Sequence, residues 1–89
     1  MNVTAARVIL QAHGIDPTAD ADDLTLVIEA TGWRLRLQRS QAPSRRRQQA
    51  PWWRAEVTHP TSGAGMVVSG PTARHVLVRV LGQILERGA

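Results

Sequence analysis

The chain has 89 residues, of which 43% are hydrophobic and 20% charged, and it contains no cysteine. This length supports one small domain with a modest core and excludes a deep, enzyme-style cavity. The absence of cysteine excludes disulfides and thiolate metal sites, and no apolar run approaches the ~20 residues that cross a membrane. The first expectation is a cytoplasmic protein with no cofactor and no membrane partner.

The formal net charge is +4, and all eleven positive side chains are arginine. Residues 1–23 hold one arginine and four aspartates, whereas residues 24–89 hold ten arginines and three glutamates. A basic body with a short acidic segment is typical of proteins that bind polyanions. The alternative is a solvated surface whose charge only aids solubility.

An amphipathic helix is predicted over residues 4–13, because its apolar positions recur at the spacing of one helical face. Thr4 is the expected N-cap, unless the helix begins a residue or two earlier, and Gly14 is the expected stop. A polar, acidic connection follows over residues 16–23. The predicted apolar stripe consists of Ala5, Val8, Ile9 and Ala12.

Four short strands are predicted next, each with alternating apolar and polar side chains. The first two form a hairpin around a tight turn at Gly32. A long, mobile basic loop with two prolines is predicted between the second and third strands, over residues 40–51. The strands are expected at residues 24–29, 33–38, 52–58 and 66–69.

A second helix is predicted near the end of the chain. Pro71 takes the first helical position, where proline is favoured, and residues 73–85 carry a broad apolar face. The order α-β-β-β-β-α places the chain in the α+β class: an antiparallel sheet of three to four strands with both helices packed on one face. One domain is expected over residues 1–89, with residues 1–23 as the first helix and its acidic connection.

The pleat of the second and third strands separates two sets of side chains, because successive residues point to opposite faces. The odd-numbered set is expected to face the helices, since burial of the even-numbered arginines would be costly. Trp53 is then a core residue, Trp33 anchors the core at the hairpin turn, and Trp52 is either exposed or covered by arginine stems. The open face is predicted to present Arg34, Arg36, Gln38, Trp52, Arg54 and Thr58.

Three adjacent arginines precede Trp52 and Arg54 in the sequence. A guanidinium forks onto phosphate or a guanine edge, and an indole face stacks on a base. Adjacent cations repel one another unless a polyanion neutralises them, although a solvated loop is the alternative. The predicted nucleic-acid-binding residues are Arg34, Arg36, Arg45, Arg46, Arg47, Trp52 and Arg54.

No combination of residues predicts catalysis or metal binding. His13, His59 and His75 lack the spacing of metal ligands, and no serine has the context of a catalytic nucleophile. Gly63-Ala64-Gly65 is too short for a phosphate-binding loop and precedes a strand. A protein that is not an enzyme is therefore expected.

A pattern of spaced motifs runs from Arg46 to Leu81: Arg47-Gln48, Pro51-Trp52, Arg54-Ala55-Glu56-Val57, Pro60, Gly63-Ala64, Gly70 and Thr72-Ala73. This segment resembles the three-stranded sheet plus helix that forms the DNA-binding domain of plant ethylene-response factors and the arm-binding domain of tyrosine recombinases. In those domains, arginines and tryptophans of the sheet read the major groove. The resemblance implies that Arg46, Arg47, Trp52 and Arg54 contact DNA.

Two other families share features of this chain. A sheet that ends in a proline- and glycine-containing turn, followed by Gly70-Pro71-Thr72 and an amphipathic helix, resembles HicB-type antitoxins. The outer layout of helix, antiparallel strands and helix is similar to a double-stranded-RNA-binding domain. Where that domain has a lysine-rich start to its second helix, this chain has Arg74 and His75.

These patterns predict a small basic regulator that binds nucleic acid, DNA in preference to RNA, through a sheet face and an arginine-rich loop. The alternative is a protein-interaction module, such as a small antitoxin, a phage-type regulator or a subunit. It would dock a protein partner or form a homodimer through its sheet. In that case Trp52 would lie beside Val27 and Val67 as an exposed protein contact.

Overall fold

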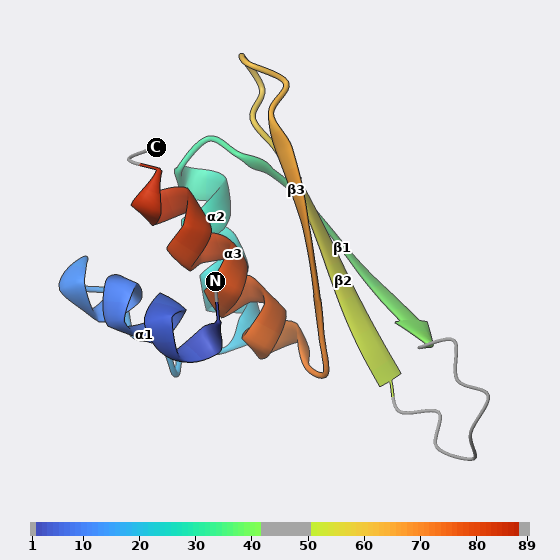
Figure 1. Ribbon diagram of the computed structural model, residues 1–89, viewed down its shortest axis with the longest axis horizontal. Helices are drawn as coiled ribbons and strands as arrows, with labels where there is room; N and C mark the ends of the chain where they lie inside the picture. Colours follow the sequence, from blue (N-terminus) through green and yellow to red (C-terminus); the bar gives the residue numbers. More distant parts are fainter. Residues whose placement is uncertain (1, 42–50, 88–89) are drawn as a thin grey trace.

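Two helices, three antiparallel strands and a third helix follow one another in the computed structural model (Figure 1). The structure describes residues 2–41 and 51–87. It has the α+β class predicted from the sequence. The elements are α1 (Val3–Ala12), α2 (Ala21–Ala30), β1 (Arg34–Gln41), β2 (Pro51–Thr58), β3 (Gly65–Gly70) and α3 (Ala73–Glu86).

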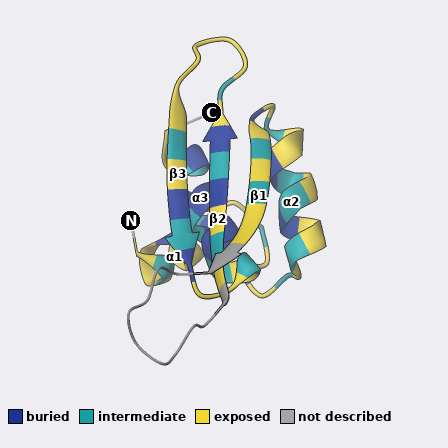
Figure 2. Cartoon of the chain, turned by 90° about the vertical axis from the view of Figure 1, so that its right-hand side faces the viewer, coloured by how far each residue is buried: buried dark blue, intermediate teal, exposed yellow. Residues whose placement is uncertain are grey.

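The strands form one sheet in the order β1-β2-β3, and the helices lie on one side of it (Figures 1 and 2). α3 packs against β2 and β3, α2 packs against β1, and α1 packs on α3. The other face of the sheet is not covered by any element that the structure describes (Figure 1). The predicted antiparallel sheet with helices on one face is therefore confirmed, with one helix more than expected.

The prediction of a strand over residues 24–29 is wrong, because this segment lies within α2. Asp20 is the N-cap, and its Oδ1 accepts a hydrogen bond of 2.9 Å from the backbone N–H of Asp23. Leu24 and Ile28 are buried, whereas Leu26 is 64% exposed. A capped acidic start and the four-residue spacing of the buried positions therefore outweigh the two-residue alternation.

The first helix starts earlier than residue 4 and buries a different face. Its N-cap is Asn2, whose Oδ1 accepts a hydrogen bond of 2.8 Å from a first-turn N–H, so Thr4 does not cap it. Ala6 and Leu10 are buried, whereas Val8 is 61% exposed. The predicted stripe is wrong because Leu10 offers more apolar area to α3 than the alanines of that stripe.

Glycines in the left-handed region end the first two helices. Gly14 follows α1 with φ +75°, and the next N–H, that of Ile15, donates to the carbonyl of Leu10 at 2.9 Å. This closing pattern confirms the predicted stop. Gly32 has φ +94° and makes a tight turn between α2 and β1. The predicted hairpin around Gly32 is therefore wrong, because the element before the turn is a helix and not a strand.

The register of the sheet confirms the predicted pleat. In the ladder between β1 and β2, Arg34 lies opposite Thr58 and Gln41 lies opposite Pro51. In the ladder between β2 and β3, Thr58 lies opposite Gly65 and Trp53 lies opposite Gly70. The predicted loop over residues 40–51 is therefore too long at both ends, and residues 42–50 lie outside the described residues. The inward residues, buried or half-buried, are Trp33, Leu35, Leu37, Trp53, Ala55 and Val57.

α3 packs against β2 and β3 of the sheet and against both other helices, which explains why it is apolar on most sides. Thr72 is its N-cap and accepts a hydrogen bond of 3.1 Å from the N–H of His75, so the helix starts after Pro71, not at it. A Cβ on Gly70 would lie 2.6 Å from Cδ2 of His75, which explains the glycine where β3 meets α3. The buried residues of α3 are Val76, Leu77, Val78, Val80, Leu81, Gly82 and Ile84.

Candidate nucleic-acid interface

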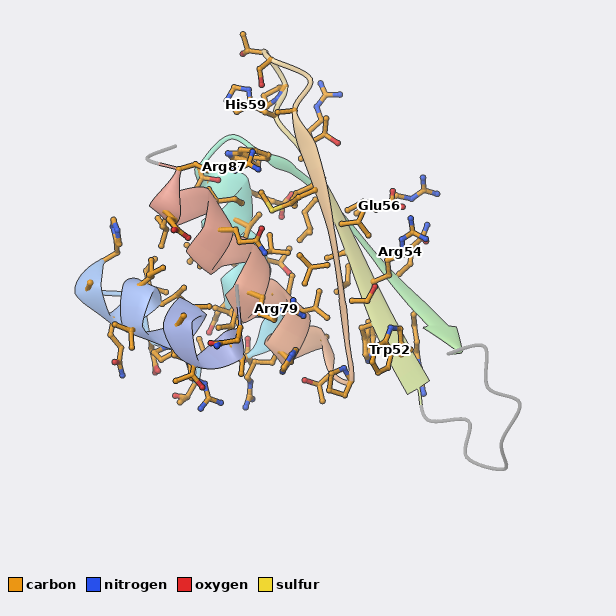
Figure 3. The ribbon with its side chains drawn as sticks, in the orientation of Figure 1. Trp52, Arg54, Glu56, His59, Arg79 and Arg87 are labelled. Atoms are coloured by element: carbon orange, nitrogen blue, oxygen red, sulfur yellow. The ribbon has the colours of Figure 1, made fainter. Side chains whose placement is uncertain are left out.

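The helix-free side of the sheet displays the even-numbered residues of β1 and β2 (Figure 3). Side chains directly opposite each other on neighbouring strands lie about 4.5–5.5 Å apart at Cβ, so these rows form one continuous surface. The rows are Arg34–Thr58, Arg36–Glu56–Val67 and Gln38–Arg54–Ser69. We call this surface the open face; it consists of Arg34, Arg36, Gln38, Trp52, Arg54, Glu56, Thr58, Val67 and Ser69.

Three arginines and one glutamate give the open face a formal charge of +2. Nη2 of Arg54 lies 3.1 Å from Oε1 of Glu56. When the amide of Gln38 is oriented with its oxygen toward Arg36, this oxygen accepts hydrogen bonds from Nε of Arg36 at 3.0 Å and from Nη2 of Arg36 at 3.3 Å. The guanidinium groups of Arg36 and Arg54 are therefore oriented by neighbours on the face and retain donors for a ligand.

Trp52 contributes the aromatic part of the open face. The residue is 36% exposed, and its even-numbered position on β2 puts it on the same face as Arg54 and Glu56, which Figure 3 shows projecting away from the helices. Val67 on β3 is 55% exposed on the same face. Val27 is half-buried on α2 in the helical layer, so the predicted cluster of Trp52, Val27 and Val67 is wrong for Val27.

The other two tryptophans belong to the helical side. Trp53 has the guanidinium of Arg39 over its ring at 5.9 Å, and Trp33 has that of Arg87 at the same distance. His59 meets the ring of Trp33 edge to face, with 5.1 Å between centroids. Trp33 lies in the core and Trp52 faces outward, as predicted. Trp53 faces inward, but it is half-buried at the margin of the core and is not one of the fully buried residues predicted.

A second group of basic side chains lies on the helices. Nη1 of Arg79 donates to the carbonyl of Ser69 at 3.0 Å, where α3 packs on β3. Burial, with the nearby guanidinium groups of Arg79 and Arg7, lowers the pKa of His75 below its usual 6.5. Since Arg7, His75 and Arg79 extend from α1 and α3, this group is separate from the open face.

The acidic residues before α2 have structural roles that the sequence analysis missed. Asp20 caps α2, and Asp22 and Asp23 lie in its first turn, where negative charge is favourable. Asp16 accepts hydrogen bonds from the hydroxyl of Thr18 at 2.7 Å and from its backbone N–H at 2.8 Å. These two hydrogen bonds lower the pKa of Asp16 below its usual 3.8.

The structure brings Arg34, Arg36, Trp52 and Arg54 onto one surface, as the sequence predicted. The other predicted residues, Arg45, Arg46 and Arg47, lie outside the described residues. Glu56 was not included in the predicted face, although it lies in its middle. The two-residue spacing between Glu56 and Arg54 on one strand was the signal that could have found their ion pair.

Neither a metal centre nor a membrane span is found in the part of the chain that the structure describes. No cluster of three or more histidine, cysteine, aspartate or glutamate side chains there could hold a metal ion. None of the described helices is long and apolar enough to cross a bilayer. No protein-family model, curated protein or solved structure matches the chain.

Proposed function

We propose that this protein binds nucleic acid, DNA in preference to RNA, through the open face. Arg34, Arg36 and Arg54 bind phosphates and fix the orientation of the ligand. Trp52 stacks on a base or wedges against one. The arginines at positions 45–47, in the connection between β1 and β2, add sequence-independent electrostatic affinity.

One observation carries this proposal: three guanidinium groups and an indole share a sheet face that no described helix covers. A face without such a role would be expected to carry shorter polar residues or to be covered, since an exposed indole leaves apolar surface in water. Arg36 and Arg54 are instead oriented by Gln38 and Glu56, which lowers the entropy cost of ordering these two side chains on a ligand.

The spacing of the arginines also suits a nucleic-acid backbone. Arg34 and Arg36 are two residues apart on β1, which is roughly 6.6–6.8 Å along the strand. Phosphates recur regularly along one nucleic-acid strand, so a row of cations on one strand of the sheet can contact more than one of them. Arg54 lies on the next strand and widens the same row of cations.

The test is fluorescence anisotropy of labelled duplex and single-stranded oligonucleotides over a salt series. The double variant Arg36→Ala/Arg54→Ala should reduce the slope of log K against log salt by about two, since each phosphate contact contributes ~0.9. Arg7→Ala/Arg74→Ala is the matched control, because it removes the same charge from exposed positions on the helices. Equal slopes for the two double variants would refute binding through the open face.

A second candidate function is a protein-interaction module, such as a small antitoxin or a subunit. The exposure of Trp52 and Val67 on one face favours it, because aromatic and aliphatic side chains anchor protein interfaces. Such a protein would show no salt-dependent binding to either oligonucleotide. The anisotropy series therefore separates the two functions.

A further inference from the structure

The two edges of the sheet differ in how they are protected. β1 carries three arginines and packs against α2. β3 has the sequence GMVVSG, with no charged residue and no proline. Charges, prolines and covering helices are the usual means by which an edge strand avoids pairing with another chain. β3 has neither charges nor prolines of its own. α3 packs against β3 as α2 packs against β1, and Arg79 of α3 reaches the carbonyl of Ser69, so the edge of β3 is the less protected of the two because its own sequence does not oppose pairing.

The backbone of β3 directs hydrogen-bonding groups to this edge. The N–H of His59 donates to the carbonyl of Ala64 at 2.7 Å, which closes the β2–β3 turn. Bonded pairs recur at every second residue of an antiparallel ladder, so Met66, Val68 and Gly70 bond to β2. Gly65, Val67 and Ser69 then point their N–H and carbonyl groups away from it. The bond from Arg79 to the carbonyl of Ser69 agrees with this geometry.

The side chains of β3 make the edge suitable for an uncharged partner strand. Val67 is 55% exposed on the open face, and Met66 is half-buried on the other face. The other two residues whose backbone groups point away from β2, Gly65 and Ser69, carry no charge. A strand that pairs here would cover the methyl groups of Val67 and would not remove any charge of β3 from water.

We propose that a second copy of this chain pairs with β3 in antiparallel orientation, about a twofold axis at Val67. Val67 then faces Val67 of the second copy, and Gly65 faces Ser69. The carbonyl of Ser69 has a second lone pair, so it can accept this bond as well as the one from Arg79. The result is a continuous six-stranded sheet.

The second copy fits this edge better than a charged foreign strand, because the pairing is self-complementary and its centre is apolar. The nearest arginine of the open face, Arg54, lies on β2, one strand away from the axis. The cations of the two copies therefore stay apart, while their open faces join into one surface. The dimer does not require the proposed nucleic-acid binding, and its test uses protein free of nucleic acid.

Sedimentation equilibrium over a wide concentration range tests the dimer. The chain mass is 9.7 kDa, and the expected result is a mass approaching twice that value. Val67→Lys should weaken self-association by roughly tenfold or more, because it places two ammonium groups opposite each other at the axis. Val8→Lys is the matched control, since Val8 is a similarly exposed valine on α1, and it should leave self-association unchanged.

A wild-type chain that remains monomeric throughout, or equal weakening by both lysine variants, would overturn the proposal. Circular dichroism of Val67→Lys checks that the monomer still folds, which is expected because the substituted side chain is exposed.

Disulfide cross-linking tests the position of the axis. The chain has no cysteine, so Val67→Cys can form a disulfide only between copies. A hydrogen-bonded antiparallel pair has Cα atoms about 5.5 Å apart, within the range that a disulfide spans. Oxidation should give a covalent dimer with Val67→Cys but not with Val8→Cys. Equal cross-linking of both variants, or none with Val67→Cys, would refute pairing at Val67.

Discussion

Arg54 and Glu56 form an ion pair of 3.1 Å on the open face, two residues apart on the central strand β2. Their side chains remain 49% and 36% exposed, and an exposed ion pair of this kind contributes only about 0–1 kcal/mol to folding. The pair matters more for binding. Glu56 orients Arg54, but it also places a negative charge in the middle of the surface that we propose contacts phosphates.

Replacing Glu56 with glutamine should therefore increase affinity for a duplex oligonucleotide by up to about fivefold at low salt, because an unfavourable charge interaction of up to ~1 kcal/mol is removed. Fluorescence anisotropy measures the change. Glu86→Gln is the control, since it makes the same charge change at an exposed position on α3. A loss of affinity in Glu56→Gln alone would mean that Glu56 contacts the ligand or that its orientation of Arg54 outweighs its charge.

The two neighbouring tryptophans should separate binding from stability. Trp53→Ala removes a half-buried indole and its contact with Arg39, which should lower the free energy of unfolding by about 2 kcal/mol. Trp52→Ala should change that free energy by less than ~1 kcal/mol but weaken binding, since stacking on a base contributes about 1–3 kcal/mol. Urea denaturation and anisotropy measure the two effects. The reverse pattern would contradict the assignment of faces.

The sheet could be predicted from the sequence because alternation and charge agree there. In the first half of β1, the odd positions Leu35 and Leu37 are apolar and the even positions are polar. Inverting the strand would bury Arg34 and Arg36. β2 has the same arrangement around Ala55 and Val57. Local pattern and the cost of burying charge therefore specify one solution, and the open face follows from it.

The segment that became α2 could not be assigned by its apolar pattern alone. Leu24, Leu26 and Ile28 fit a strand period, while Leu24 and Ile28 also fit a helix period. The distinguishing signal was the N-cap aspartate followed by a first turn with two further aspartates. Those residues were interpreted as a charged connection, so the helix start was missed.

Contacts on the helical side of the sheet depend on tertiary packing, which the sequence does not encode locally. Arg39 over Trp53 joins residues on different strands, and Arg87 over Trp33 joins α3 to the start of β1. Such pairs require the register and the layer arrangement to be known first. The same is true of Arg79, which reaches the carbonyl of Ser69.

Asp20→Ala should destabilise the fold through α2. The Oδ1 of Asp20 accepts the hydrogen bond from Asp23 N–H, and loss of an N-cap costs about 1 kcal/mol. Urea denaturation should show a lower midpoint with an unchanged slope. Asp22→Ala is the control, because Asp22 interacts with the helix dipole without capping it, and its effect should be smaller. Equal effects would mean that charge, not the cap, stabilises this end.

The three arginines between β1 and β2 should affect salt dependence more than specificity. Replacement of Arg45, Arg46 and Arg47 by alanine is expected to reduce the slope of log K against log salt by roughly two to three. The ratio of affinities for different duplex sequences should stay nearly constant, because phosphate contacts do not read sequence. If anisotropy titrations give an unchanged slope of log K against log salt, these arginines do not contact the nucleic acid.

His75 should make the protein less stable as the solution becomes mildly acidic. Burial, Arg79 and Arg7 lower the pKa of His75 in the folded state below the usual 6.5 of the unfolded chain, so the unfolded state binds more protons. The free energy of unfolding should therefore fall as the pH drops below about 6.5, until His75 is protonated in both states. Asp16, whose pKa is also lowered in the folded state, causes a separate loss of stability only as the pH falls below its usual 3.8.

Urea denaturation between about pH 7.5 and 5 measures the effect of His75. The free energy of unfolding should depend less on pH in His75→Gln than in wild type. His13→Gln is the control, because His13 is exposed. An identical pH profile for wild type and His75→Gln would show that burial and the two arginines do not lower the pKa of this histidine.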